Sequence, residues 1–147
     1  MRILCLGVVV GISGCSKLMS NLLNDIKSKK IDFVIVNGEN AAAQGVGLTK
    51  EICNDFFNCG VDVITTGNHV WDQKEIMEYI DKEERLLRPK NLFEPAPGRG
   101  FNIYNTKNDI KNLQSRPSSE LLKYETVNSW ENFKKQLEDS IATAKGI

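Results

Sequence analysis

The sequence predicts an α/β fold in which parallel strands alternate with helices. Apolar runs recur along the first half of the chain, amphipathic stretches separate them, and glycine or polar residues mark each junction. Uninterrupted apolar runs are typical of strands covered on both faces, as in a parallel sheet. A strand–helix–strand order then requires right-handed crossovers. At 147 residues, the chain is the size of one domain with a real core.

The individual elements follow from these patterns. The predicted strands are residues 2–11, 31–38 and 61–67, and the predicted helices are residues 16–30, 49–60 and 72–83. The first helix has leucines at helical spacing and lysines at its end, where the helix dipole favours them. Thr49 is the expected N-cap of the second helix, and Gly60 ends it.

The chain changes character after residue 84. The stretch "LLRPKNLFEPAPGRGF" holds three of the four prolines and is typical of an extended surface loop, and "FNIYN" after it fits one more strand. Residues 105–147 show no further strand–helix alternation. Residues 129–147 have the pattern of an amphipathic helix, with Ser129 as cap and Trp130 and Phe133 on its apolar stripe. We therefore divide the chain into an α/β domain, residues 1–104, and a helical tail, residues 105–147.

The composition excludes several classes of protein. Nineteen basic residues balance nineteen acidic ones, so charge gives no argument for DNA or an anionic membrane as partner. No apolar run approaches the ~20 residues of a membrane-spanning helix, and the start has no clear signal-peptide pattern. We expect a cytoplasmic protein. Its four cysteines form no C-x-x-C pair and are expected to be free thiols in or near the core.

Two polar clusters follow successive predicted strands. Glu39 and Asn40 come after the second strand, and Asn68 and His69, the only histidine, come after the third. Carboxylate and amide oxygens are hard metal ligands, and an imidazole can give a proton to a leaving oxygen near neutral pH. The alternative is structural: Asn37–Gly38 is a strong turn signal, and a lone histidine is most often a loop residue. Because neighbouring parallel strands end at one edge, we expect the clusters to meet.

Other phosphate-binding signals are weak. The stretch "GVVVGISG" lies between a strand and a helix, but it matches neither G-x-G-x-x-G nor a P-loop. Arg88, Lys90 and Arg99 could contact a phosphate, although a solvated loop is the simpler interpretation.

Four stretches together resemble a known family: "RILCLGVVVG", "DFVIVNGENAAAQGVGLT", "GVDVITTGNHVWD" and "LLRPKNLFEPAPGRGF". They are similar to the YmdB-like branch of the calcineurin-like metallophosphoesterases, which are cyclic-nucleotide phosphodiesterases. The resemblance covers residues 1–104. It implies the N-terminal half of a four-layer αββα sandwich built around two divalent metal ions, iron or manganese. It also implies a small phosphodiester or nucleotide as substrate.

The resemblance assigns a role to each polar residue. Glu39 would bridge the two metal ions, Asn40 and Asn68 would ligate the second one, and His69 would be the proton donor. Two-metal sites activate a hydroxide and neutralise charge that grows on the phosphate.

The chain departs from the family pattern at two points. The family's Gly-Asp-Val-Val-Gly reads Gly7-Val8-Val9-Val10-Gly11 here, so Val8 replaces a metal-binding carboxylate. No histidine follows His69, whereas the family has three metal-binding histidines in its second half. Two hypotheses result: an impaired metal-dependent phosphodiesterase, or an inactive truncated remnant or non-catalytic nucleotide- or phosphate-binding module. A truncated sheet would also have an open edge, so we expect a homo-oligomer.

Overall fold

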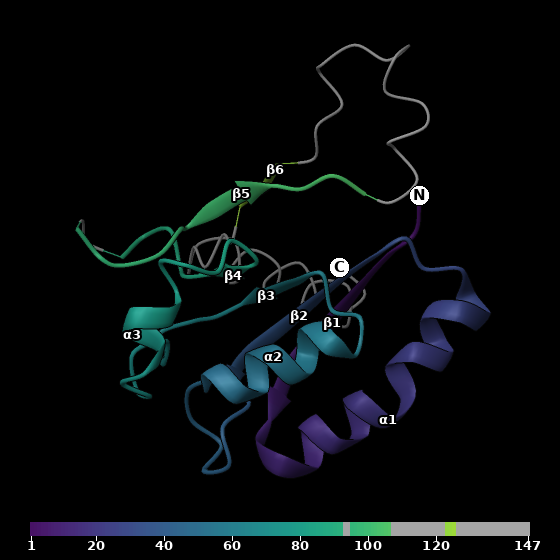
Figure 1. Cartoon of the computed structure of the whole chain (residues 1–147), viewed down its shortest axis with the longest axis horizontal. Helices are drawn as coiled ribbons and strands as arrows, with labels where there is room; N and C mark the ends of the chain where they lie inside the picture. The colour runs from purple at the N-terminus through teal and green to yellow at the C-terminus, as the bar shows by residue number, and fades with distance from the viewer. Residues whose placement is uncertain (93–94, 107–122, 126–147) are drawn as a thin grey trace, which may run out of the picture.

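A computed structural model describes residues 1–92, 95–106 and 123–125 of the chain (Figure 1). Its elements are β1 (Ile3–Val10), α1 (Gly11–Lys29), β2 (Phe33–Asn40), α2 (Lys50–Asn58), β3 (Val63–Thr65), α3 (Ile76–Tyr79), β4 (Leu86–Leu87), β5 (Phe101–Ile103) and β6 (Lys123–Glu125). Strands β1 to β4 form a parallel sheet in the order β1-β2-β3-β4. The predicted α/β class and its parallel crossovers are therefore confirmed.

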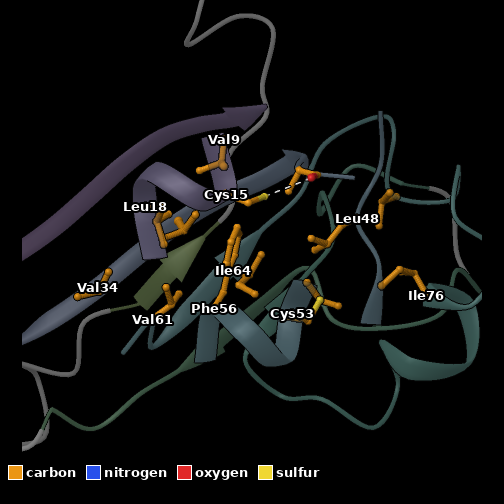
Figure 2. Close-up of a cluster of buried hydrophobic side chains, with 14 of the residues drawn as sticks. Val9, Cys15, Leu18, Val34, Leu48, Cys53, Phe56, Val61, Ile64 and Ile76 are labelled. Carbon is orange, nitrogen blue, oxygen red and sulfur yellow. Dashed lines mark hydrogen bonds between the residues drawn. The ribbon is translucent and has the colours of Figure 1, made fainter. Parts of the chain in front are cut away.

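The sheet is covered differently on its two faces. Helices α1 and α2 lie together on one face, and the antiparallel pair β5–β6 lies on the other side (Figure 1). The larger core lies under the helices and includes Val34, Leu48, Phe56 and Ile64, each at most 1% exposed (Figure 2). This face removes most of the apolar surface from water and is the main source of stability.

A smaller core lies on the opposite face of the sheet. Phe33, Val63 and Leu87 are buried there, and the half-buried Tyr104 packs against them. The rings of Phe33 and Tyr104 lie 5.9 Å apart, in a tilted arrangement that aromatic pairs favour. The chain that follows β4 thus covers the face of the sheet that the helices leave open.

Two element boundaries differ from the prediction. Helix α1 begins at Gly11 rather than at residue 16, with no loop after β1. Gly11 has a φ of 61°, and this left-handed conformation lets the chain turn directly from strand to helix. Strand β2 runs to Asn40, so Glu39 and Asn40 are its last two residues and do not follow it.

The region after β3 departs further from the prediction. The helix expected over residues 72–83 is limited to α3, with turns on both sides. The expected surface loop contains the buried strand β4, and Arg88 next to it is only 3% exposed. Its guanidinium donates hydrogen bonds to the carbonyls of Pro89 and Pro97, so it holds the proline-rich loop from inside. The proline pattern predicted a loop but could not show that the loop folds around an arginine.

The predicted helix over residues 129–147 lies outside the described residues. Within the tail, residues 123–125 form β6, a strand where a helix was expected. The four cysteines are free thiols as predicted, but Cys5 is exposed rather than in the core. No helix in the described part of the chain is long and apolar enough to cross a lipid bilayer.

Candidate functional site

The candidate site lies at the carboxyl ends of the neighbouring strands β2 and β3. Asn37 of β2 pairs with Thr65 of β3, so the last residues of β2 face the turn that follows β3. This is the edge at which open α/β sheets place their functional groups. The two polar clusters recognised in the sequence therefore come from neighbouring strands, as expected.

Glu39 makes the contact that joins the two clusters. The backbone N–H of His69 donates to Glu39 Oε1 at 3.4 Å. The carboxylate also lies directly against Gly67, where a Cβ would overlap all three atoms of the carboxyl group. Glycine at this position is what allows the carboxylate to lie against the turn. The expectation that the clusters meet is confirmed, whereas the role of each residue remains a prediction.

His69 is oriented by a residue of its own turn. Its Nδ1 lies 2.8 Å from Asp72 Oδ2, and both side chains are about 40% exposed. A carboxylate at Nδ1 favours a proton on that nitrogen, which leaves Nε2 available to other groups. Asp72 was not among the predicted site residues. The spacing of His69 and Asp72 could have indicated the contact, because a turn brings residues that are three positions apart in the chain close together.

The turn that carries His69 is held by buried neighbours. Val70 is 1% exposed, and Thr66 donates its hydroxyl to the carbonyl of Leu87 at 2.8 Å. Gln73 reaches the loop after β2 and donates to the carbonyl of Val46 at 3.0 Å. A Cβ at Gly47, which has a φ of 79°, would lie 3.3 Å from the carbonyl oxygen of His69. Both loops are therefore packed against each other, which fixes the approach of His69 to Glu39.

The two asparagines occupy different surroundings. Asn40 is half-buried at the end of β2 and pairs in register with Val10 of β1. Asn68 is exposed and lies between Gly67 and His69, the two residues that contact Glu39. Both asparagines therefore lie at the same end of the sheet as Glu39.

Val8 is an apolar residue near the carboxyl end of β1, at the same end of the sheet as the candidate site. It pairs in register with Asn37 of β2 and is 49% exposed. The strand is irregular here, because its register with β2 shifts on both sides of Val8. An isopropyl group supplies no ligand and no charge, so β1 contributes nothing to cation binding at this position.

The described side chains do not fit a two-metal centre by themselves. Residues 1–92, 95–106 and 123–125 contain no group of three or more histidine, cysteine or acidic side chains that could hold a metal ion. Glu39 supplies one negative charge, while Asn40 and Asn68 are neutral. Divalent cations in proteins take about four to six or more donors, many of them anionic.

The basic residues of the proline-rich loop have structural partners. Arg88 is buried among backbone carbonyls, as described above. Lys90 Nζ lies 4.9 Å from the centre of the Phe101 ring, and Arg99 reaches Glu84 at 3.3 Å. The solvated-loop interpretation is therefore wrong for Arg88, whose guanidinium is used inside the loop.

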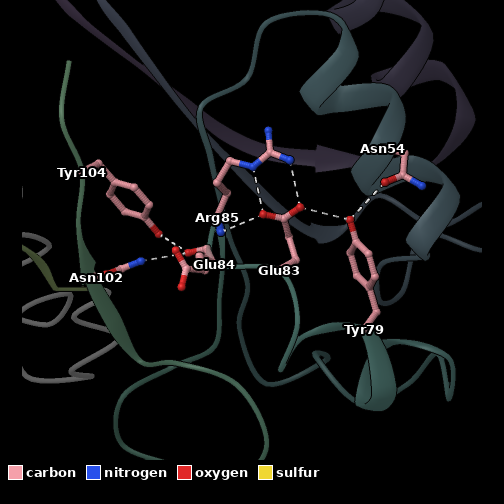
Figure 3. Close-up of polar contacts among 7 residues, drawn as sticks. All are labelled: Asn54, Tyr79, Glu83, Glu84, Arg85, Asn102 and Tyr104. Atoms are coloured by element: carbon pink, nitrogen blue, oxygen red, sulfur yellow. Dashed lines mark hydrogen bonds and ion pairs between the residues drawn. The ribbon is translucent and has the colours of Figure 1, made fainter. Parts of the chain in front are cut away.

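A second polar network lies between α2, α3 and β4 (Figure 3). Glu83 accepts two hydrogen bonds from the Arg85 guanidinium, at 2.9 and 2.8 Å, and one from the Tyr79 hydroxyl at 3.4 Å. The Arg85 guanidinium, which also lies over the Phe57 ring, holds the pKa of the Glu83 carboxyl below its usual value. Burial raises the pKa of Tyr79 to about 12. These residues connect elements of the fold rather than forming part of the strand-end site.

Comparisons with known proteins agree with this fold and site. The profile of the YmdB-like protein family matches residues 4–144, further along the chain than the motifs within residues 1–104. The chain is 42% identical over 120 residues to the 2′,3′-cyclic-nucleotide 2′-phosphodiesterase of Bacillus subtilis, covering 79% of this chain and 45% of that protein.

Two solved structures share the fold. A hypothetical protein from Thermus thermophilus is 37% identical with a TM-score of 0.65, over 71% of this chain and 40% of that one. A phosphatase from Mycoplasma pneumoniae is 32% identical with the same TM-score of 0.65, over 71% of this chain and 38% of that one. The chain thus spans less than half the length of these relatives.

Fold and strand-end site together define the class, an α/β protein with the fold of the phosphatase relative. The chain belongs to the YmdB-like protein family.

Proposed function

We propose that this chain carries part of a phosphodiester-hydrolysing site and needs metal ligands beyond those of its described residues for full activity. The contact between Glu39 and the His69 backbone supports this most directly, because it brings the polar ends of β2 and β3 together. The similarity to a cyclic-nucleotide phosphodiesterase supports the reaction class. The proposed substrates are small phosphodiesters such as cyclic nucleotides.

In this proposal His69 is the general acid. Its imidazolium would give the Nε2 proton to the leaving oxygen, while Asp72 holds Nδ1–H and stabilises the positive charge. Asp72 is thus a positioning residue. Glu39, Asn40 and Asn68 are the proposed oxygen donors of this chain toward two divalent ions, iron or manganese. By themselves they do not complete such a centre.

Val8 supports a second candidate function. Because β1 contributes no carboxylate, the candidate site at the strand ends has Glu39 as its acidic donor among the proposed ligands and would hold a cation weakly. A non-catalytic protein that binds a phosphate or nucleotide would need the fold and the strand ends but no metal centre. This candidate predicts ligand binding without turnover.

Metal loading and turnover of the purified chain test the proposal. We expect weak, substoichiometric binding of manganese or iron and near-background hydrolysis of a chromogenic phosphodiester. Val8→Asp should raise manganese affinity by roughly tenfold, the lower end of what single ligand-sphere changes produce. Turnover should stay low in both proteins, because the added carboxylate supplies only one of the missing donors.

Leu23→Asp is the matched control, since it adds the same charge at a 50% exposed position in the middle of α1, away from the strand ends. Equal gains in the two variants would contradict a cation site beside β1. Tight stoichiometric metal with rapid turnover by the unmodified chain would contradict the need for further ligands. Saturable binding of a cyclic nucleotide without turnover, in the metal-loaded Val8→Asp variant too, would favour the non-catalytic candidate.

A further inference from the structure

The carboxyl end of β2 contains a β-bulge. Val8 and Val10 of β1 are two positions apart, whereas the β2 residues that they pair with are three positions apart. These partners are Asn37 and Asn40, so one residue of β2 is extra between them. Bulges are uncommon between parallel strands, and they often re-aim a side chain beside a functional site. Glu39 of the candidate site lies inside this bulge.

The side chain of Asn37 supplies a hydrogen-bond acceptor in the bulge. Its Oδ1 accepts a hydrogen bond from the backbone N–H of Glu39 at 2.9 Å. Asparagine commonly bonds to the backbone two residues further along the chain. Because a bulge interrupts the ladder between two strands, an acceptor from a side chain helps to keep the N–H groups there satisfied. Asn37 therefore stabilises the extra residue within the strand.

The backbone on both sides of Glu39 is fixed by packing. A Cβ at Gly38 would lie 3.0 Å from Ile64 Cγ2, so the backbone at this residue lies directly against the core. Ala41, which is fully buried, donates its N–H to the carbonyl of Gly38 at 3.1 Å. The direction of the Glu39 side chain is thus set by the conformation of the bulge.

The bulge places the Glu39 carboxylate against the turn that follows β3. Strands β2 and β3 pair as far as Asn37 and Thr65, so Glu39 and Gly67 are each two residues beyond the last pair. The carboxylate lies directly against Gly67. It also accepts the backbone N–H of His69 at 3.4 Å, which is long for a hydrogen bond and leaves little room for displacement.

We propose that Asn37 is a positioning residue that acts through Glu39. By accepting the N–H of Glu39, it holds the bulge in the conformation that presents the carboxylate to Gly67 and His69. The use of this position rests on the proposed function, in which Glu39 and His69 belong to one site. The contact itself needs neither metal nor substrate, so it can be measured without them.

The amide proton of His69 reports on the contact in ¹H–¹⁵N NMR, because its chemical shift depends on its acceptor. Glu39→Ala removes the acceptor and should move this signal in the unmodified chain. Made in an Asn37→Ala background, the same change should have roughly half the effect or less, because the carboxylate has already moved from the turn. Asn37→Asp keeps an oxygen acceptor and should restore most of the effect.

Two further backgrounds separate the hydrogen bond from a weaker strand. Asn37→Val lacks the acceptor but suits a strand, so it should behave as Asn37→Ala does. Ile35→Ala is the matched control, because Ile35 packs on the smaller core where the β1–β2 register is regular. It should weaken β2 and leave the full effect of Glu39→Ala.

Three results would overturn the proposal. The first is no effect of Glu39→Ala on the His69 amide in the unmodified chain. The second is an undiminished effect in both acceptor-free variants at position 37, and the third is an equal reduction in Ile35→Ala. Turnover does not enter these measurements, so a failure of the proposed function and a failure of the role of Asn37 appear in separate experiments.

Discussion

At the scale of single residues, the pair formed by His69 and Asp72 decides which imidazole nitrogen can serve a substrate. Their 2.8 Å contact lies on an exposed turn, so it contributes little to stability. Its effect is on the position of a proton. A carboxylate that accepts from Nδ1–H holds the ring in one orientation and leaves Nε2 as the nitrogen that a substrate can use.

This arrangement predicts the tautomer of the neutral histidine. We expect the Nδ1–H form to predominate in the unmodified chain and the Nε2–H form to become the major one in Asp72→Ala. Long-range ¹H–¹⁵N NMR measures this without ambiguity, because His69 is the only histidine. Asp72→Asn keeps an oxygen acceptor and should retain more Nδ1–H form than Asp72→Ala. A dominant Nε2–H form in the unmodified chain would rule out the positioning role.

At the scale of elements, helix α2 shows how a local signal fixes the start of a helix. Thr49 Oγ1 accepts a hydrogen bond from the backbone N–H of Ile52 at 3.2 Å, as the sequence predicted. The helix then places Phe56 and Cys53 in the core, both at 0% exposure. Burial raises the pKa of the Cys53 thiol, so this cysteine stays protonated and unreactive.

The N-cap gives a measurable contribution to stability. Thr49→Ala should lower the free energy of unfolding by about 1 kcal/mol, because the N–H of Ile52 loses its acceptor. Thr49→Ser keeps the hydroxyl and should cost much less. Urea unfolding followed by circular dichroism measures both. Equal losses in the two variants would mean that the methyl group of Thr49, rather than its hydroxyl, stabilises the helix.

At the scale of the whole molecule, the polar network in Figure 3 links folding to pH. Hydrogen bonds from Arg85 lower the pKa of Glu83 in the folded state. A carboxyl group with a depressed folded pKa adds stability above its unfolded pKa and loses it as pH falls through the folded value. The loss therefore begins as pH falls below the ordinary value of about 4.5.

Acid unfolding should reveal this contribution. Glu83→Gln should be less stable than the unmodified chain at neutral pH, and its stability should fall less between pH 4.5 and lower values. Thermal unfolding across pH measures the difference. Glu84→Gln is the control, since Glu84 is 69% exposed and its contact with Arg99 contributes little. Parallel pH profiles for the unmodified chain and Glu83→Gln would exclude the network as a source of acid sensitivity.

Local sequence patterns predicted much of the fold. Apolar runs predicted β1, β2 and β3, leucine spacing predicted α1, and the Thr49 cap predicted the start of α2. These signals are readable because each depends on residues close together in the chain. The short α3 and the buried Arg88 were not predicted, because turns and burial there depend on β4 and the proline-rich loop packing from a distance.

Some features of the candidate site could likewise be predicted from the sequence, and others could not. The order of residues already shows polar side chains at the ends of β2 and β3, Val8 where the family has a carboxylate, and His69 as the only histidine. The contact of Glu39 with Gly67 and the orientation of His69 by Asp72 became visible in the folded chain alone. Residue type and order are local properties, whereas contacts across a sheet depend on strand register and on how closely two loops can pack.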